Sequence, residues 1–216
     1  MRVIIAGSTG MVGNLLLDNC LASDKTSEVK SLVRKPTGKK HPKLVEIVIR
    51  DFEDYSEQLH LFKNITVAFF CVGVYTGAVP DDEFKKITVN YAVAFATALR
   101  EESPNATICL LSGAGADSTE KSKTAFARYK GMAENRISDL NLKLYSFRPA
   151  YIYPVEPRKE PNIAYKILRA VYPILKLFGK NISIKSDELA RAMFNVGMNG
   201  ADKKILENKD ILMYAN

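Results

Sequence analysis

The sequence has few of the residues that build disulfide frameworks or metal centres. In 216 residues it contains three cysteines, Cys20, Cys71 and Cys109, and two histidines, His41 and His60. The cysteines are odd in number, widely separated and set in apolar surroundings, so we expect small buried side chains rather than a disulfide framework. The histidines lie near neither a cysteine nor each other, so no metal site is predicted.

Long apolar runs are also missing. The longest run, residues 65–74, has the length of a strand and falls short of the roughly 20 residues that a membrane span requires. The N-terminus shows no basic stretch ahead of a signal-type apolar segment. With 47% hydrophobic residues, the chain can bury one sizeable core. We therefore expect a soluble, cytoplasmic protein with a single domain.

The net charge of +7 raises the question of nucleic-acid binding, because lysine and arginine neutralise phosphates. The positive charge is dispersed, with mild clusters only at residues 34–40 and 121–130, and no recognised nucleic-acid motif accompanies it. We therefore expect no nucleic-acid partner, and attribute the charge to a solvated surface that partly serves an anionic cofactor.

The chain is organised around residues 2–13, which read RVIIAGSTGMVG. The apolar, β-branched run at the start is typical of a strand buried on both faces. Gly7, Gly10 and Gly13 follow with the spacing G-x-x-G-x-x-G, and residues 15–21 suit an apolar helix. A strand, a glycine turn and a helix in this order form the context that a dinucleotide-binding fingerprint requires.

Each glycine of this motif has a physical role. Gly7 allows a tight turn off the strand, Gly10 lets a pyrophosphate approach the backbone, and Gly13 lets the helix pack closely on the strand. The helix N-terminus offers free N–H groups and a positive dipole end to the phosphates. Ser8 and Thr9 are expected to add hydroxyl donors.

Further along, strand-like and helix-like segments alternate. Strands are expected at residues 29–33, 44–49, 66–71, 106–111 and 142–147, and helices at 54–62, 81–100 and 124–140. This alternation predicts an α/β fold, a Rossmann-type doubly wound parallel sheet of about six to seven strands. Its ligand crevice is expected at the carboxyl ends of the strands.

After Pro149 the composition changes. Helices are expected at residues 163–177 and 187–198, the second with Ser186 as its N-cap, followed by short apolar pieces at 203–206 and 211–214. We expect one domain over residues 1–216, in which residues 150–216 contribute a small cap over the mouth of the crevice.

The tip of the second strand bears on cofactor choice. An acid there pairs with the 2′-hydroxyl of NAD, whereas a base suits the 2′-phosphate of NADP. The sequence lacks an acid at this tip and has Arg34, which can bind phosphate through two charged hydrogen bonds. NADP(H) is the preferred cofactor on this basis, and NAD(H) remains possible.

Several motifs in order resemble the atypical short-chain dehydrogenase/reductases, and among them the Tat-interacting-protein group with its bacterial relatives. These motifs are GSTGMVG, LVR, DF, LSGAGAD, YKG, FRP and LENKDI. The resemblance implies an NADP-type oxidoreductase. It implies these cofactor contacts: Gly7, Ser8, Thr9, Gly10, Met11, Val12 and Gly13 at the pyrophosphate, Arg34 at the 2′-phosphate, Asp51 and Phe52 at the adenine, Cys71, Val72 and Gly73 along the ribose, and Pro149 at the nicotinamide.

The resemblance also exposes a missing residue. The family's catalysis uses Ser, Tyr and Lys, with Tyr-x-x-x-Lys on one helix face, where Lys lowers the Tyr pKa and holds the ribose. Ser112 matches the serine and Lys130 the lysine, but Phe126 stands at the tyrosine position. Tyr129 is a substitute candidate, although adjacent helix residues diverge by about 100°.

Two functions remain open from the sequence. In the first, the protein reduces a small-molecule carbonyl substrate, and Tyr75, Tyr129, Tyr151 or water supplies the proton. In the second, it is a non-catalytic NADP(H)-sensing regulatory or scaffold protein with a protein partner. The sequence indicates neither the substrate nor the oligomeric state.

Overall fold

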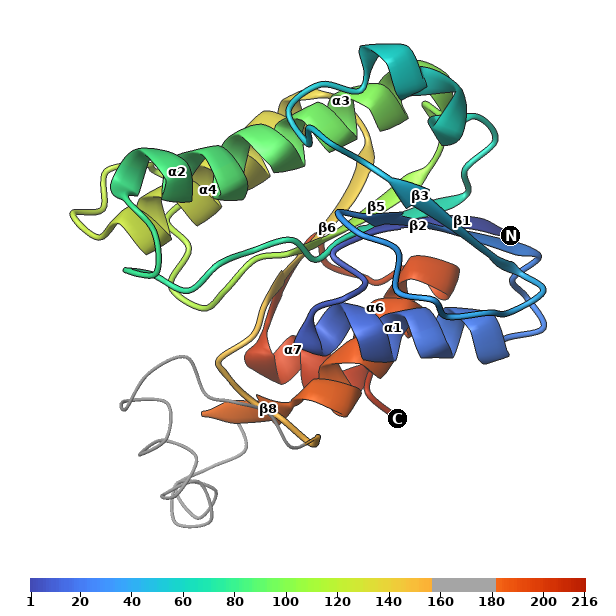
Figure 1. Cartoon of the computed structure of the whole chain (residues 1–216). Coiled ribbons are helices and arrows are strands. Elements are labelled where there is room, and N and C mark those ends of the chain that lie inside the picture. Colours follow the sequence, from blue (N-terminus) through green and yellow to red (C-terminus); the bar gives the residue numbers. More distant parts are fainter. Residues whose placement is uncertain (157–181) are drawn as a thin grey trace.

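A seven-stranded parallel sheet forms the centre of the computed structural model, which describes residues 1–156 and 182–216 (Figure 1). The strand order is β3-β2-β1-β4-β5-β6-β9. The strands are β1 (Arg2–Ala6), β2 (Glu28–Val33), β3 (Leu44–Val48), β4 (Val67–Phe70), β5 (Thr107–Leu111), β6 (Lys143–Arg148) and β9 (Ile205–Glu207). A separate small sheet pairs β7 (Tyr151–Tyr153) with β8 (Ser183–Lys185). The predicted Rossmann-type doubly wound α/β fold is confirmed.

Helices cover both faces of the large sheet, as Figure 1 shows. One layer lies over one face: α2 (Asp81–Lys85), α3 (Tyr91–Glu102) and α4 (Ala125–Asp139). The other face carries α1 (Met11–Ala22), α6 (Ser186–Asn199) and α7 (Asn208–Met213). No helix in residues 1–156 or 182–216 is long and apolar enough to cross a membrane.

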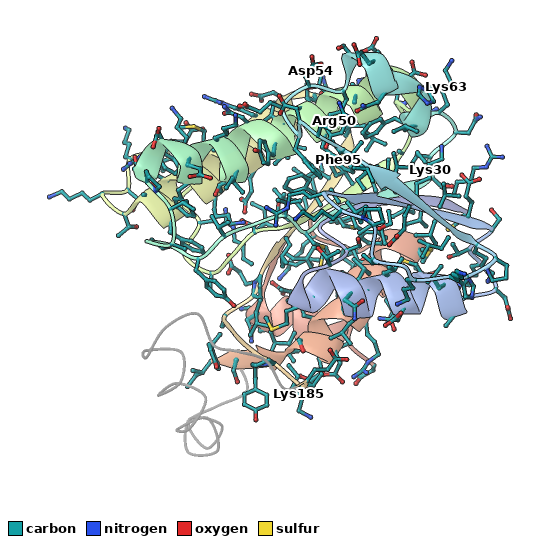
Figure 2. All side chains as sticks on the ribbon, in the orientation of Figure 1. Lys30, Arg50, Asp54, Lys63, Phe95 and Lys185 are labelled. Carbon is teal, nitrogen blue, oxygen red and sulfur yellow. The ribbon has the colours of Figure 1, made fainter. Side chains whose placement is uncertain are left out.

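Strand β1 shows why this sequence forms a central strand. Val3 and Ile5 enter the core on the side of α1 and α6, whereas Ile4 and Ala6 enter the core on the side of α3. All of these side chains are fully buried, because the strand has helices on both faces. On the α3 side, Phe95 lies between that helix and the sheet (Figure 2). Its ring centroid is 5.3 Å from that of Phe62 and 5.5 Å from that of Phe70.

Two expected helices differ in detail. The segment expected to be helical over 54–62 is a 3-10 helix over Ser56–Phe62. The long helix expected over 81–100 contains one π-helical stretch, Lys86–Asn90, which separates α2 from α3. A π-type turn inserts an extra residue into the helical ladder, and such turns are frequent near functional sites. The helix expected over 163–177 lies outside the described residues.

The expected N-cap of α6 is wrong by one residue. The helix begins at Ser186, and Lys185 precedes it with an extended backbone. The backbone N–H of Lys185 donates to the Glu188 carboxylate at 3.0 Å. The Glu188 side chain therefore caps the N-terminus of the helix. The Ser186 hydroxyl instead accepts a hydrogen bond from the Val155 N–H at 3.1 Å, because it is turned toward the chain that leaves β7.

The expected C-terminal cap is smaller than residues 150–216. Strand β9 pairs with β6 as the last strand of the sheet, and α6 packs against α1. These elements bury core residues such as Leu189, Met193 and Leu206, so they belong to the layers of the domain and do not form a separate cap. Of the described part of this region, Ala150, Tyr151, Ile152 and Pro154 line the crevice.

Candidate functional site

A cavity of about 370 Å³ opens at the carboxyl ends of the central strands. The parallel register pairs Ala6 with Phe70 and Leu111 with Phe147, so the residues that follow these strands meet at one edge of the sheet. The lining comes from Gly10 and the first turn of α1, the loop after β4, the end of β5 with the loop that follows it, one face of α4, and the segment after β6 that includes part of β7. It comprises Gly10, Met11, Val12, Gly13, Cys71, Val72, Gly73, Val74, Tyr75, Thr76, Leu111, Ser112, Gly113, Phe126, Lys130, Pro149, Ala150, Tyr151, Ile152 and Pro154.

The three glycines of the turn differ in what surrounds them. Gly7 has a φ of +88°, and a Cβ there would lie 2.6 Å from the backbone carbon of Cys71. A Cβ on Gly13 would lie 2.1 Å from the Gly7 oxygen. Both glycines are therefore required by the fold itself. A Cβ on Gly10 would meet only the Gly7 oxygen, at 3.3 Å, so the space beside this residue is open toward the cavity.

The N-terminus of α1 is the part of the turn that suits an anion. Gly10 is the N-cap residue, and no side chain caps the helix. Its first N–H groups are therefore available to an acceptor that enters the cavity beside Met11 and Val12. An open cradle at a glycine, next to uncapped helix N–H groups, fits the pyrophosphate of a dinucleotide.

Ser8 and Thr9 do not line this cavity. The Ser8 side chain is buried and its Oγ lies 2.6 Å from the Oγ of Ser31 on β2. That hydrogen bond ties the turn to the neighbouring strand, and the expected phosphate contact of the Ser8 hydroxyl stays a prediction. Thr9 is exposed at the outer side of the turn.

The three residues expected around the adenosine lie outside the cavity, past the carboxyl ends of β2 and β3. Arg34 follows β2 directly and is exposed. Asp51 is exposed, and its carboxylate accepts the Glu53 N–H at 2.8 Å. Phe52 is buried in the core, where its ring centroid lies 5.7 Å from that of Tyr91. Phe52 therefore packs under this edge of the sheet, while Arg34 and Asp51 present charged groups on it.

Lys130 reaches the cavity from α4. Its Nζ donates a hydrogen bond to the carbonyl oxygen of Leu111, the last residue of β5, at 3.0 Å. Burial lowers the pKa of the Lys130 ammonium to about 8, while the Glu134 carboxylate one turn along the helix works in the opposite direction. The lysine is thus a proton donor whose pKa lies close to neutral pH.

Ser112 lies beside this contact, directly after Leu111. Its N–H donates to the Phe147 oxygen at 2.8 Å, which holds the residue on the end of the sheet. Its Oγ is buried and has no hydrogen-bond partner in the described part of the chain. A buried polar group left without a partner costs about 1–3 kcal/mol, so a ligand oxygen that bonds to Ser112 would recover that cost.

Phe126, one helical turn before Lys130, fills the neighbouring part of the cavity. A Cβ on Gly113 would lie 2.5 Å from Cζ of the Phe126 ring, so the tip of the ring rests on this glycine. Cζ is the atom that would carry the hydroxyl of a tyrosine. A tyrosine here would carry its hydroxyl group close to Gly113, the residue that follows Ser112. Phenylalanine instead leaves an apolar ring at this point.

Tyr129 does not reach the cavity, which corrects its place among the candidate catalytic residues. Its hydroxyl donates to Asp81 at 2.6 Å, and its ring packs against Phe84 with centroids 5.9 Å apart. The reason is the divergence of about 100° between adjacent helix residues: Lys130 faces the cavity, so Tyr129 faces α2. Tyr75 and Tyr151 do line the cavity.

The residues expected along the ribose and at the nicotinamide line the cavity, and their contacts with a cofactor stay predictions. Cys71, Val72 and Gly73 form its wall after β4, and Pro149 forms its wall after β6. Cys71 is a free, half-buried thiol, and burial raises its pKa to about 12, so it stays neutral and unreactive at neutral pH. Pro149 also accepts the Ala114 N–H at 2.9 Å, which joins the loops after β5 and β6.

A buried ion-pair network under the cavity was not recognised in the sequence. Arg148 makes two hydrogen bonds to the Glu134 carboxylate, at 2.6 and 3.1 Å. The same guanidinium donates to Glu207 at 3.3 Å and to the Ser118 hydroxyl at 2.9 Å. It thereby joins α4, β6, β9 and the loop after β5. Arg148 is part of the FRP motif, and Glu134 lies three residues after the YKG motif. Their place in or beside these motifs was the sequence signal that could have pointed to the pair.

Asn208 is a second supporting residue that was missed. Its side-chain oxygen accepts the Ala150 N–H at 2.9 Å, and its amide nitrogen donates to the Ser183 oxygen at 3.1 Å. Asn208 belongs to the LENKDI segment, so this segment holds the chain at Ala150, one of the residues of the cavity wall.

Comparisons with known proteins identify the fold. No family model and no curated protein matches the sequence. Among solved structures, Gre2 from Candida albicans in complex with NADPH is similar with a TM-score of 0.72 and 14% identity, over 96% of this chain and 77% of that chain. A short chain dehydrogenase from Burkholderia cenocepacia in complex with NADP has a TM-score of 0.67 and 16% identity, over 94% of this chain and 86% of that chain.

The UDP-glucose 4-epimerase of Thermotoga maritima, solved with UDP-glucose, is similar to the same extent. Its TM-score is 0.70 and its identity 15%, over 96% of this chain and 76% of that chain. The similarity extends across nearly the whole sequence in each case, while the identity is low. This chain therefore shares the Rossmann-type α/β fold of these nucleotide-binding enzymes.

Proposed function

We propose that the protein is an NADP(H)-dependent oxidoreductase that acts on a small carbonyl substrate through an altered Ser-Tyr-Lys site. The observation that carries the proposal is the meeting of an open glycine cradle, at Gly10, with Ser112 and Lys130 in one cavity. The structures with the same fold were solved with NADPH, NADP or NAD, which supports a nicotinamide dinucleotide as cofactor; Arg34 at the tip of β2 is the ground for preferring the phosphorylated form. The motifs noted in the sequence support an atypical short-chain dehydrogenase/reductase near the Tat-interacting-protein group.

In this proposal the chain holds the cofactor along the edge of the sheet. Gly10, Met11 and Val12 hold the pyrophosphate with the N–H groups of α1, and Arg34 meets the 2′-phosphate at the tip of β2. Val72 and Gly73 pass along the ribose, and Pro149 borders the nicotinamide. When bound, the reduced cofactor supplies a hydride. Ser112 holds the substrate oxygen in the same cavity.

The cofactor preference provides the test. We expect calorimetric titration to show NADPH binding at least several-fold tighter than NADH, because Arg34 can form two charged hydrogen bonds to the 2′-phosphate. Arg34→Ala should narrow this gap and leave NADH affinity nearly unchanged. Lys63→Ala is the matched control, since it removes the same charge from an exposed side chain that precedes β4 at the opposite edge of the sheet. Equal affinities in the parent protein would contradict the preference.

The second candidate function is a non-catalytic NADP(H) sensor or scaffold with a protein partner. The observation that favours it is Phe126, which places an apolar ring where the family has its proton donor. Tight NADPH binding without turnover on any aldehyde, ketone or quinone would select this function over the oxidoreductase.

A further inference from the structure

Lys130 is the charged residue of the cavity wall. Among the described residues that line the cavity, it alone carries a full charge at neutral pH. Three N–H bonds extend from its Nζ, and one of them is directed to the Leu111 oxygen at 3.0 Å. The others remain for a group inside the cavity.

We propose that the Lys130 ammonium is itself the acid that protonates the substrate carbonyl oxygen, with the Ser112 hydroxyl holding that same oxygen. This assignment rests on the proposed function and names the residue that does the work of the missing tyrosine. It makes Lys130 a catalytic residue rather than a support for a phenol.

Lys130 and Ser112 line the same cavity at the end of β5. Lys130 is anchored to the carbonyl of Leu111, and Ser112 is the next residue in the chain. The Ser112 Oγ is buried, lines the cavity and has no partner in residues 1–156 and 182–216. An oxygen that enters at the end of β5 can therefore accept from the Ser112 hydroxyl and from Lys130 together.

Phe126 shapes this corner without taking part in proton transfer. Its ring rests on Gly113 and closes the side of the cavity from which a tyrosine would act. Lys130 lies one helical turn further on the same face and lines the same cavity. An apolar neighbour in this place favours the neutral amine over the ammonium, which makes the lysine a stronger acid.

The charges around Lys130 are consistent with this role. Burial is the largest effect and lowers its pKa to about 8, where an acid is effective near neutral pH. Glu134 on α4 and Cys71 after β4 raise the pKa, but the Glu134 carboxylate is held by Arg148 from β6, and the Cys71 thiol stays neutral. The phenols of Tyr75 and Tyr151 face the same cavity, whereas Tyr129 is bonded to Asp81.

The proton and electron balance is complete. The carbonyl carbon receives the hydride, with its electron pair, from the reduced cofactor. The carbonyl oxygen receives the proton as one N–H bond of Lys130 breaks and the new O–H bond forms, which leaves a neutral amine at Lys130. The amine then recovers a proton from water through the open cavity, and the products are the alcohol and the oxidised cofactor.

The first test measures the lysine without any turnover. The apo protein is labelled with an amine-reactive reagent over a range of pH, and the modified Lys130 peptide is quantified by mass spectrometry, with exposed Lys63 calibrating the reagent. We expect a labelling midpoint for Lys130 at least one unit below the value of about 10.4 for a free lysine side chain. A midpoint at or above the free value would overturn the proposal.

The second test uses NADPH-driven reduction of an aldehyde and quinone panel. Turnover of the parent should fall as pH rises through about 8, because the ammonium is the active form. Lys130→Met and Lys130→Arg should both lower kcat by about 100-fold or more, since arginine keeps the charge but cannot release a proton. Calorimetry checks that both variants still bind NADPH.

The outcomes separate the proposal from its rivals. Full turnover in Lys130→Arg would show that only the positive charge is needed and would overturn it. A Tyr75→Phe or Tyr151→Phe variant that loses the falling limb near pH 8 would name that phenol as the acid instead. A parent protein that binds NADPH but reduces no member of the panel at any pH overturns the assignment of Lys130 and leaves the cofactor site standing. Failure to bind NADPH overturns the proposed function itself, whereas the labelling midpoint still reports on Lys130.

Discussion

The glycine turn and the Ser112–Phe126–Lys130 corner lie in the same cavity but are built in different ways. The turn is a continuous stretch whose shape depends on backbone contacts, since a Cβ on Gly7 or Gly13 would overlap backbone atoms. The corner combines a side chain from the loop after β5 with two from α4, and α4 is bonded to β5 through Lys130 and to β6 through the Arg148 network, which extends to β9. The turn has no room for a substitution at these two glycines. At the corner the Phe126 ring packs on Gly113 through side-chain atoms, so a ring of similar shape can be exchanged there with less disturbance.

The largest expected effect lies beneath the corner, in the buried pair of Arg148 and Glu134. Arg148→Met removes one partner and leaves the Glu134 carboxylate buried without compensation, so we expect a loss of about 3–5 kcal/mol in the free energy of unfolding. Urea denaturation measures it. The double variant Arg148→Met/Glu134→Leu should recover part of this loss, because the uncompensated charge is gone.

The control for that experiment is an exposed pair in the same protein. Lys39 contacts Asp18, and the two side chains are 33% and 50% exposed. Lys39→Met should therefore cost no more than about 1 kcal/mol. Equal losses at Arg148 and Lys39 would mean that burial does not set the value of the Arg148 network.

The next effect separates the two roles of glycine within the turn. Gly13→Ala places a Cβ 2.1 Å from the Gly7 oxygen. We expect a loss of about 2–3 kcal/mol from overpacking, although alanine is the better helix former. Gly10→Val should lose less stability than Gly13→Ala, because a Cβ on Gly10 would lie 3.3 Å from the Gly7 oxygen, a tight contact that a shift of a few tenths of an ångström relieves.

Thermal unfolding with and without NADPH tests whether Gly10 borders the cofactor site. A ligand that binds only the folded state stabilises it by about 2.7 kcal/mol at a hundredfold excess over its dissociation constant. The parent should show such a shift, and Gly10→Val should show none, because the valine side chain fills the cradle. A folded Gly10→Val variant with the full shift would place the cofactor elsewhere.

A smaller effect concerns the contribution of Lys130 to the free energy of unfolding. Its folded pKa lies below its unfolded value, so the unfolded state binds more protons between these values and the stability contributed by this group rises with pH through that window. Lys130→Met should therefore be more stable than the parent by about 1–3 kcal/mol at pH 7. The difference should shrink as pH is raised toward about 10. A destabilised variant with no pH dependence would show that burial does not penalise the ammonium.

The smallest expected effect is a gain at the corner. Phe126→Tyr restores a phenol one turn before Lys130, so turnover on aldehydes or quinones should rise by about tenfold, within the range of a positioned acid. The pH at which turnover of this variant begins to fall should be higher than in the parent, because a phenol has a higher pKa than Lys130. Folding is checked by circular dichroism, since the new hydroxyl points toward Gly113. A well-folded, NADPH-binding variant that stays inert on every carbonyl would favour the sensor function.

Local patterns in the sequence were sufficient for the order of strands and helices and for the glycine turn. The run at residues 3–6 is buried on both faces as predicted, and Gly7 and Gly13 lie where only glycine fits. Helix periodicity likewise predicted that Tyr129 and Lys130 would diverge. These features depend on residues within one or two turns of each other, so their physics can be read from neighbours along the chain.

Tertiary structure decided what each polar group of the site binds. Ser8 bonds to Ser31, Ser112 is left without a partner in the described chain, and Tyr129 bonds to Asp81. Arg148 meets Glu134 and Glu207, which are separated from it by 14 and 59 residues. Sheet register brings such groups together, and burial then shifts their pKa values, as it does at Lys130. The sequence by itself determined a Rossmann-type fold and placed Phe126 one helical turn before Lys130; only the packing of α4 on the sheet decided that a buried lysine with a lowered pKa would line the same cavity as a serine without a partner in the described residues.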